Sequence, residues 1–123
     1  MSKPKILYVD DEELNLMLFG INFEKAFEVY TAQNGQEGLR ILNSNPDISL
    51  VISDMKMPGM DGLEFIRNAR ENNPGKTYFI LTGFEITAAL RDALDTGLIS
   101  NCFRKPFNLV ELKEAFQLAL SKS

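Results

Sequence analysis

The chain has 123 residues, 45% of them hydrophobic, which is the length of one domain that can bury a core. Its formal net charge is -4 and no cluster of Lys and Arg is visible, so we expect no direct binding of nucleic acid. It has a single cysteine, no signal-peptide pattern and no apolar run near the roughly 20 residues that span a membrane, which predicts one cytoplasmic domain, residues 1–123, without a membrane partner.

Short apolar runs alternate with helically spaced apolar residues along the chain. The runs that predict strands are residues 6–9, 27–31, 48–53, 78–81 and 99–103. The segments that predict helices contain Leu14, Met17, Leu18 and Ile21, then residues 36–42, then Leu63, Phe65, Ile66 and Ala69, then Ile86, Ala89, Leu90, Ala93 and Leu94, and finally residues 109–120. Strands that are apolar on both faces and alternate with helices predict an α/β fold, in which helices cover both sides of a parallel sheet.

A few single residues refine the predicted helices. Asn108 is suited to cap the last helix, and Asp61, beside a glycine, is suited to cap the third. Gly20 and Gly38 lie inside helical stretches, where each lowers helix stability by about 1 kcal/mol relative to alanine. The sequence reveals no functional role for either glycine.

Polar side chains follow four of the apolar runs. Asp10 and Asp11 come after the first run, Asp54 after the third, Thr82 ends the fourth, and Lys105 follows the fifth. Ligands of parallel α/β sheets bind beyond the carboxyl ends of the strands, so we expect these side chains in one crevice. Repulsion among carboxylates favours a hard cation there. A metal ion together with a lysine suits a phosphoryl group, because both cations neutralise phosphoryl oxygens.

Each of these residues also has an ordinary structural interpretation. Asp10 and Asp11 are suited to cap the first helix, since aspartate is favoured at an N-cap and in the first turn. Thr82 alone is typical of a strand end, and Lys105 alone is typical of a solvated surface. Asp54 is harder to explain in this way, because an unpaired carboxylate directly after a buried strand is costly.

Taken in order, the motifs resemble the receiver (CheY-like) domain of two-component response regulators. The matching segments are Asp10-Asp11, Asp54, Met57 to Gly62, Thr82-Gly83 and Lys105-Pro106-Phe107, and the likeness extends from about Lys5 to Leu120. The resemblance implies a flavodoxin-like, doubly wound five-stranded parallel sheet in the order 2-1-3-4-5 with five helices. It also implies an aspartyl phosphate, made from a partner histidine kinase, and a requirement for Mg²⁺.

The resemblance assigns roles around the metal and the acceptor. Asp54 matches the phosphoacceptor, whose carboxylate oxygen attacks phosphorus and forms an acyl phosphate. Asp11 and Asp54 match direct Mg²⁺ ligands, and the backbone carbonyl of Lys56 matches a third. Asp10 matches a ligand that acts directly or through water.

Further residues match the groups that hold the phosphoryl oxygens. Thr82 matches the hydroxyl that bonds one oxygen, and Lys105 matches the ammonium that pairs with the group from the other side. Backbone N–H groups of Met55, Lys56 and Gly83 would complete the site, and glycine leaves the approach open because it has no side chain.

The resemblance also implies what the domain acts with. The phosphodonor is a histidine kinase or a phosphotransfer protein, and the output is a downstream protein or a phosphorylation-dependent homodimer. The chain is then not an enzyme on a separate substrate, since it catalyses only its own phosphorylation and dephosphorylation. The remaining alternative is a receiver-like binding module that acts without phosphorylation, although such modules usually lack one of the site residues.

Other classes of protein fit the residues less well. A phosphatase of the haloacid dehalogenase type needs a second aspartate two residues after its nucleophile, and Lys56 stands there. A flavodoxin-like electron carrier needs a phosphate loop after the first strand, where Asp10 and Asp11 would repel phosphate. The motif of P-loop hydrolases is absent, and the chain has no histidine, which excludes a histidine phosphotransfer protein.

Two departures from the usual receiver pattern carry information. Receivers generally have Tyr or Phe three residues before the lysine, and this chain has Cys102, which we interpret as a small thiol that fills a core gap. Phe103 should point to the opposite face of the strand and belong to the core. Lys56 and Phe84 occupy the variable positions beside the phosphoryl group and are expected to affect hydrolysis, with Phe84 as the side chain that moves.

Overall fold

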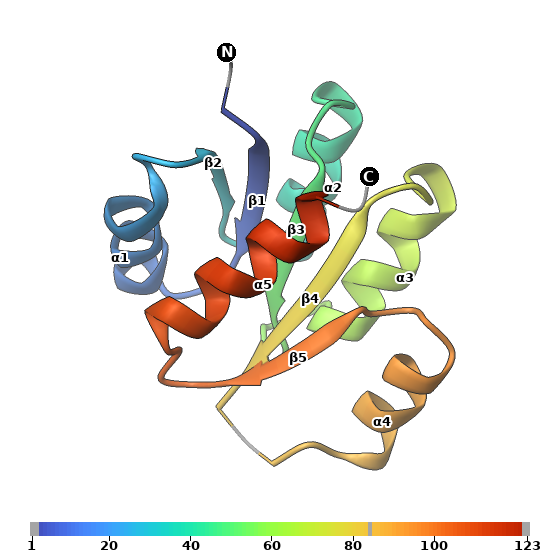
Figure 1. The fold of residues 1–123 in the computed structure, drawn as a ribbon. Helices are drawn as coiled ribbons and strands as arrows, with labels where there is room; N and C mark the ends of the chain where they lie inside the picture. The colour runs from blue at the N-terminus through green and yellow to red at the C-terminus, as the bar shows by residue number, and fades with distance from the viewer. Residues whose placement is uncertain (1–2, 84, 122–123) are drawn as a thin grey trace.

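The computed structural model describes residues 3–83 and 85–121, in which five strands alternate with five helices (Figure 1). The strands are β1 (Lys5–Val9), β2 (Glu28–Ala32), β3 (Leu50–Asp54), β4 (Thr77–Thr82) and β5 (Asn101–Arg104). The helices are α1 (Glu13–Phe23), α2 (Gly35–Ser44), α3 (Gly62–Asn72), α4 (Ala88–Asp95) and α5 (Leu109–Ser121). Within the described ranges, no helix has both the length and the apolar character needed to cross a membrane.

The five strands form one parallel sheet, as the strand pattern predicted, in the order β2-β1-β3-β4-β5, as the resemblance to receiver domains implied. The central strand β3 is buried along its whole length, from Leu50 to Asp54, which explains its unbroken apolar run. The edge strands β2 and β5 are partly exposed, so the expectation of strands apolar on both faces holds for the centre of the sheet only.

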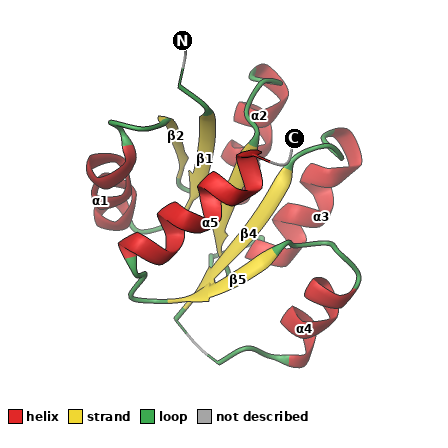
Figure 2. Ribbon diagram, viewed as in Figure 1, coloured by secondary structure: helices red, strands yellow, loops and turns green. Residues whose placement is uncertain are grey.

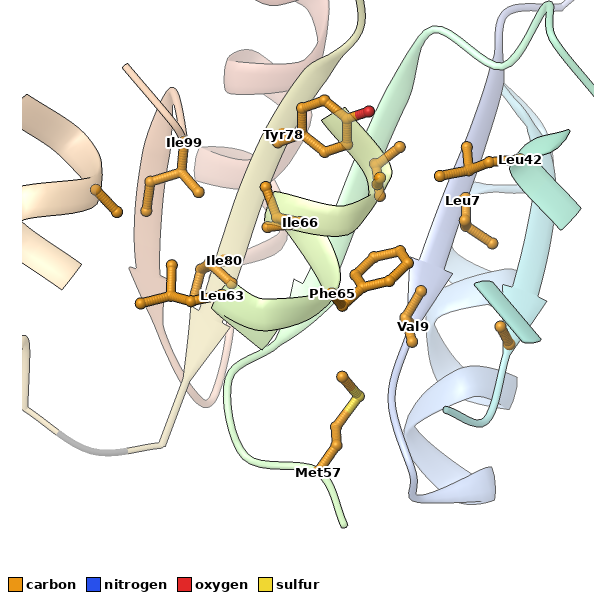
Figure 3. Close-up of a cluster of buried hydrophobic side chains, with 14 of the residues drawn as sticks. Leu7, Val9, Leu42, Met57, Leu63, Phe65, Ile66, Tyr78, Ile80 and Ile99 are labelled. Atoms are coloured by element: carbon orange, nitrogen blue, oxygen red, sulfur yellow. The ribbon is translucent and has the colours of Figure 1, made fainter. Parts of the chain in front are cut away.

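Helices lie on both faces of the sheet (Figure 2), and a hydrophobic cluster fills the space on each face. On the face covered by α1 and α5 the cluster is rich in aromatic rings, among them Phe19, Phe23 and Phe116. On the other face, α2, α3 and α4 pack against the sheet, and Figure 3 shows Phe65 of α3 beside Val9 of β1. The fold is therefore a doubly wound α/β fold, with helices packed on both faces of one parallel sheet.

Helix α1 presents a different face to the core than its predicted apolar stripe indicated. Its buried side chains are Leu16, Phe19 and Phe23. The four residues whose spacing predicted the helix are exposed: Leu14 61%, Met17 56%, Leu18 44% and Ile21 60%. The helix is thus apolar on two sides, one packed against the sheet and α5 and one facing solvent.

The predicted helix caps are present in α3 and α5. Asp61 Oδ1 accepts a hydrogen bond from Glu64 N at 2.9 Å, and Asn108 Oδ1 accepts one from Glu111 N at 3.0 Å. The first helix differs, because its N-cap residue is Glu12 and makes no side-chain cap hydrogen bond. Neither Asp10 nor Asp11 is the N-cap residue of α1, so the ordinary structural interpretation of this pair is wrong.

The two helical glycines predict stability changes of opposite sign. A Cβ on Gly38 would lie 2.8 Å from the buried ring of Phe65 and 3.1 Å from Val9, whereas a Cβ on Gly20 meets nothing within 4 Å. We expect Gly38→Ala to lower the free energy of unfolding by about 1 kcal/mol or more through overpacking. Gly20→Ala should raise it by about 0.5–1 kcal/mol, because alanine loses less backbone entropy in a helix. Urea denaturation of both variants measures this, and equal effects would contradict the packing role of Gly38.

Candidate functional site

The carboxyl ends of β1, β3, β4 and β5 bring together the side chains that the sequence singled out. Asp10 directly follows β1, Asp54 ends β3 and Thr82 ends β4, and all three are buried. Lys105 directly follows β5 and is partly buried. Asp11 is exposed, yet one oxygen of its carboxylate lies within 4.8 Å of one oxygen each of Asp10 and Asp54, which are also within 4.8 Å of one another.

The Lys105 ammonium bridges the two buried carboxylates. Its Nζ lies 3.1 Å from Asp10 Oδ2 and 3.1 Å from Asp54 Oδ1. Burial acts to lower the pKa of Lys105, but the hydrogen bonds and charges of Asp54 and Asp10 outweigh it and raise the pKa above its usual value. Lys105 therefore stays protonated, and its ammonium links Asp10 after β1 to Asp54 at the end of β3, two residues that are far from Lys105 in the sequence.

Asp10 is completely buried and is held by several donors. Its Oδ2 accepts hydrogen bonds from the Tyr8 hydroxyl at 2.5 Å, from Asn15 Nδ2 at 3.2 Å and from Lys105 Nζ at 3.1 Å. Its Oδ1 accepts one from the backbone N–H of Glu12 at 2.9 Å. Sequence reasoning missed Tyr8 and Asn15, although the two-residue spacing of Tyr8 and Asp10 places both side chains on one face of β1.

Asp54 is less well compensated than Asp10. Burial raises the pKa of its carboxyl, the hydrogen bond and charge of Lys105 act against this rise, and the negative charges of Asp10 and Asp11 add to it. The pKa of Tyr8 is also raised, first by burial and then by its hydrogen bond to Asp10, so its hydroxyl stays protonated and acts as a donor. Among residues 3–83 and 85–121, the crevice brings together three carboxylates and one ammonium, which leaves an excess of negative charge.

This donor set fits Mg²⁺. Three carboxylates that each place one oxygen within 4.8 Å of the other two offer the hard oxygen ligands that Mg²⁺ prefers, and a divalent cation would relieve the excess charge. Asp10, Asp11 and Asp54 would hold the ion, with the backbone carbonyl of the exposed Lys56 as a further candidate ligand.

The loops around Asp54 are positioned by backbone contacts. Met55 N donates to Leu81 O at 2.9 Å, so this N–H, expected to bind phosphoryl oxygens, is used by the sheet. A Cβ on Gly62 would lie 2.5 Å from Asp54 O, which explains glycine at the start of α3. A Cβ on Gly83 would meet nothing within 4 Å, as expected for an open approach. A cavity of about 190 Å³ lies beside Thr82.

Three further residues of the receiver pattern are Phe84, Cys102 and Phe103. Phe84, which was expected to flank the phosphoryl group and to move, lies outside the described residues. Cys102 is half-buried against the cluster on the α2, α3 and α4 face, and burial raises the pKa of its thiol. Phe103 lies in the cluster on the opposite face, where its ring makes an edge contact with that of Phe79, with 5.5 Å between the ring centroids. It is therefore a core residue, as predicted.

Comparison with known families identifies the chain's relatives. The family model "Response regulator receiver domain" matches residues 6–117. The chain is 30% identical over 117 residues to sporulation initiation phosphotransferase F of Bacillus subtilis (strain 168), covering 94% of this chain and 92% of that protein. It is 34% identical to the transcriptional regulatory protein GlrR of Escherichia coli (strain K12), covering 96% of this chain but only 26% of that protein.

Solved structures show the same fold. The crystal structure of a response regulator receiver domain protein from Clostridium thermocellum superposes with a TM-score of 0.86 and 33% sequence identity. The superposition covers 97% of this chain and 95% of that chain. The fold that carries these polar residues at its strand ends is therefore also the fold of a solved receiver domain.

The raised pKa of Asp54 predicts how the stability of the metal-free protein changes when the Asp54 carboxyl group is removed. The folded state holds the Asp54 proton more tightly than the unfolded state, so stability falls as pH rises from the ordinary aspartate value, about 3.9, through the raised pKa. The Asp54→Asn variant has no ionisable group at position 54, so it does not lose stability in this way as the pH rises. Its melting temperature should exceed that of the wild type at pH 7 without metal, and the difference should shrink below about pH 4.

A surface aspartate provides the control of opposite sign. Lys5 Nζ lies 2.6 Å from Asp47 Oδ2, and this hydrogen bond lowers the pKa of Asp47. Asp47→Asn should leave the melting temperature at pH 7 unchanged or slightly lower, because exposed ion pairs contribute little. Thermal unfolding of both variants between pH 3 and pH 8 tests the prediction, and a wild type more stable than Asp54→Asn at pH 7 would contradict it.

Proposed function

The chain belongs to the response regulator receiver domain family, and on this premise we propose that Asp54 accepts a phosphoryl group from a histidine kinase or a phosphotransfer protein in a Mg²⁺-dependent reaction. Residues 1–123 would act as a single cytoplasmic receiver domain that signals to a downstream protein or through a phosphorylation-dependent homodimer. The observation that carries the proposal is the Lys105 ammonium, 3.1 Å from the Asp54 carboxylate and inside a group of three carboxylates.

The proposed reaction moves a phosphoryl group from nitrogen to oxygen. A carboxylate oxygen of Asp54 attacks phosphorus, the new P–O bond forms, and the P–N bond of the donor phosphohistidine breaks. The electron pair of that bond stays on the imidazole nitrogen, which takes a proton. When bound, Mg²⁺ neutralises phosphoryl oxygens and so lowers the repulsion between Asp54 and the incoming group.

The chain's own residues then hold the product. The Lys105 ammonium pairs with a phosphoryl oxygen, for which it must give up part of its contact with Asp54. Thr82, buried at the end of β4, lines one cavity together with the loop that follows Asp54, and its hydroxyl would donate to a second oxygen. Movement of Thr82 beside its 190 Å³ cavity would pass the change to the segment before α4.

The exposed stripe of α1, formed by Leu14, Met17, Leu18 and Ile21, supports a helical protein as the phosphodonor. The spacing of these residues makes a continuous apolar face on one side of the helix, which suits an apolar helix of a partner. Helix α1 begins at Glu13, three residues after Asp10, so a helix docked there would lie next to the acceptor crevice. We assign this face to the donor that carries the phosphohistidine.

Phosphorylation itself is the first test. Incubation with acetyl phosphate and Mg²⁺ should add one phosphoryl group to the wild type, and the label should be labile to hydroxylamine, as an acyl phosphate is. Asp54→Asn should not be labelled, and wild type without Mg²⁺ should be labelled far more slowly. Intact-mass spectrometry measures each. Equal labelling of Asp54→Asn would contradict the acceptor, and an unlabelled wild type would favour a binding module that acts without phosphorylation.

The donor face predicts a difference between protein and small-molecule donors. Leu14→Glu should slow phosphotransfer from a phosphorylated kinase or phosphotransfer domain that labels the wild type, by about tenfold or more, because an apolar contact is lost. Labelling by acetyl phosphate should be unchanged. The control is Leu118→Glu on α5, since Leu118 is 60% exposed and Leu14 61%. Equal slowing in both variants would remove α1 as the docking face.

A further inference from the structure

A buried tyrosine hydroxyl contacts the metal-site carboxylate that is most deeply buried. Tyr8 is completely buried, and its ring stacks on Phe19 with 4.4 Å between ring centroids. Its hydroxyl donates to Asp10 Oδ2 at 2.5 Å. The backbone ladder continues through Asp10, whose N–H donates to Ala32 O at 3.1 Å, so the main chain on both sides of this contact is held.

The hydrogen bonds on Asp10 are distributed unevenly between its two oxygens. Oδ2 accepts from Tyr8, Asn15 and Lys105, which fills the acceptor capacity of one carboxylate oxygen. In the described part of the chain, Oδ1 accepts only the Glu12 N–H and so keeps a lone pair for a cation or its water. The rotation of the carboxylate therefore decides which oxygen serves the metal site.

Of the three donors on Oδ2, Tyr8 is the most firmly placed. Lys105 divides its ammonium between Asp10 and Asp54 and would turn to the phosphoryl group during the proposed reaction. The Asn15 amide makes the longest contact, at 3.2 Å, from a partly buried side chain. The Tyr8 side chain is fully buried in the cluster on the α1 and α5 face, where its ring stacks on Phe19.

We propose that Tyr8 is a positioning residue of the metal site: its hydroxyl fixes the rotation of the Asp10 carboxylate, keeps Oδ1 for the cation, and thereby favours Mg²⁺ over larger divalent ions. This inference rests on the proposed function, since it requires that the three carboxylates bind Mg²⁺. Mg²⁺ demands near-ideal octahedral geometry, whereas Ca²⁺ accepts flexible geometry, so fixed ligand orientation benefits Mg²⁺ more.

Loss of the hydroxyl has two opposing consequences. A donor on a carboxylate withdraws charge from it, so removing the donor alone would strengthen the binding of every cation. Removing the donor also leaves the Asp10 carboxylate with fewer contacts that fix its rotation, since only Asn15, Lys105 and the Glu12 N–H remain, and this weakens binding of the ion with the stricter geometry. Partners that orient metal ligands typically contribute about 10- to 100-fold to affinity. We therefore expect the loss of orientation to dominate for Mg²⁺.

The test compares two buried tyrosines. Tyr8→Phe and Tyr78→Phe each remove one hydroxyl from a completely buried side chain, and the Tyr78 hydroxyl donates to Asn73 O at 2.7 Å, beyond the opposite ends of the strands from Asp54. Dissociation constants for Mg²⁺ and Ca²⁺ are measured by isothermal titration calorimetry on unphosphorylated protein. Tyr8→Phe should bind Mg²⁺ about tenfold more weakly and Ca²⁺ with a smaller change. Tyr78→Phe should match the wild type for both ions.

Each other outcome has one meaning. Mg²⁺ affinity within twofold of the wild type, tighter binding of both ions, or equal weakening for both ions in Tyr8→Phe would overturn the positioning role. Equal effects of Tyr8→Phe and Tyr78→Phe would also overturn it, because they would indicate general loss of stability. A wild type that binds no Mg²⁺ would instead overturn the proposed function.

A measurement on the wild type keeps the inference testable if Tyr8→Phe does not fold. Buried hydroxyl protons that exchange slowly are observed by proton NMR, and the Tyr8 and Tyr78 hydroxyls serve as probe and control. Addition of Mg²⁺ should shift the Tyr8 hydroxyl resonance and leave that of Tyr78 in place. A Tyr8 resonance unaffected by saturating Mg²⁺ would show that its hydrogen bond to Asp10 is not coupled to the metal.

Discussion

The contact of the Lys105 ammonium with Asp10 and Asp54 is the interaction on which the arrangement of the strand ends depends. Two buried carboxylates side by side repel one another, and such a pair is tolerated only with compensating charge and hydrogen bonds. Lys105, which follows the edge strand β5, supplies that charge to residues that follow β1 and end β3. Because one cation serves two anions, the crevice keeps an excess of negative charge, which a divalent metal ion would relieve.

The two buried aspartates are held in different ways, and the difference matches the roles proposed for them. Asp10 is fixed through both oxygens by Tyr8, Asn15, Glu12 N and Lys105. Asp54 has Lys105 as its cationic partner, and its pKa is raised because burial outweighs that contact. A ligand carboxylate benefits from fixed orientation, whereas an acceptor carboxylate benefits from weak compensation, since a strongly held charge is a poorer nucleophile.

Helix α1 connects the core to the surface proposed for the donor. Phe19 of this helix stacks on Tyr8, which contacts Asp10, while Leu14 and Leu18 on the other side of the same helix face solvent. The covered side therefore supports the carboxylate proposed to hold the metal ion, and the exposed side is the face proposed for the donor.

Periodicity in the sequence was sufficient to predict ten elements in their order, the parallel sheet, and the convergence of Asp10, Asp54, Thr82 and Lys105, because the strands of a parallel sheet end at the same edge. The tertiary structure decided the rest. The buried side of α1 was undetermined, since both of its sides are apolar and spacing alone does not say which one meets the sheet. The packing role of Gly38 depends on how closely α2 approaches Phe65, and the hydrogen bond from Tyr8 to Asp10 depends on side-chain rotamers that a strand pattern does not specify. Alternation places two side chains on one face, but only packing around them determines that they touch.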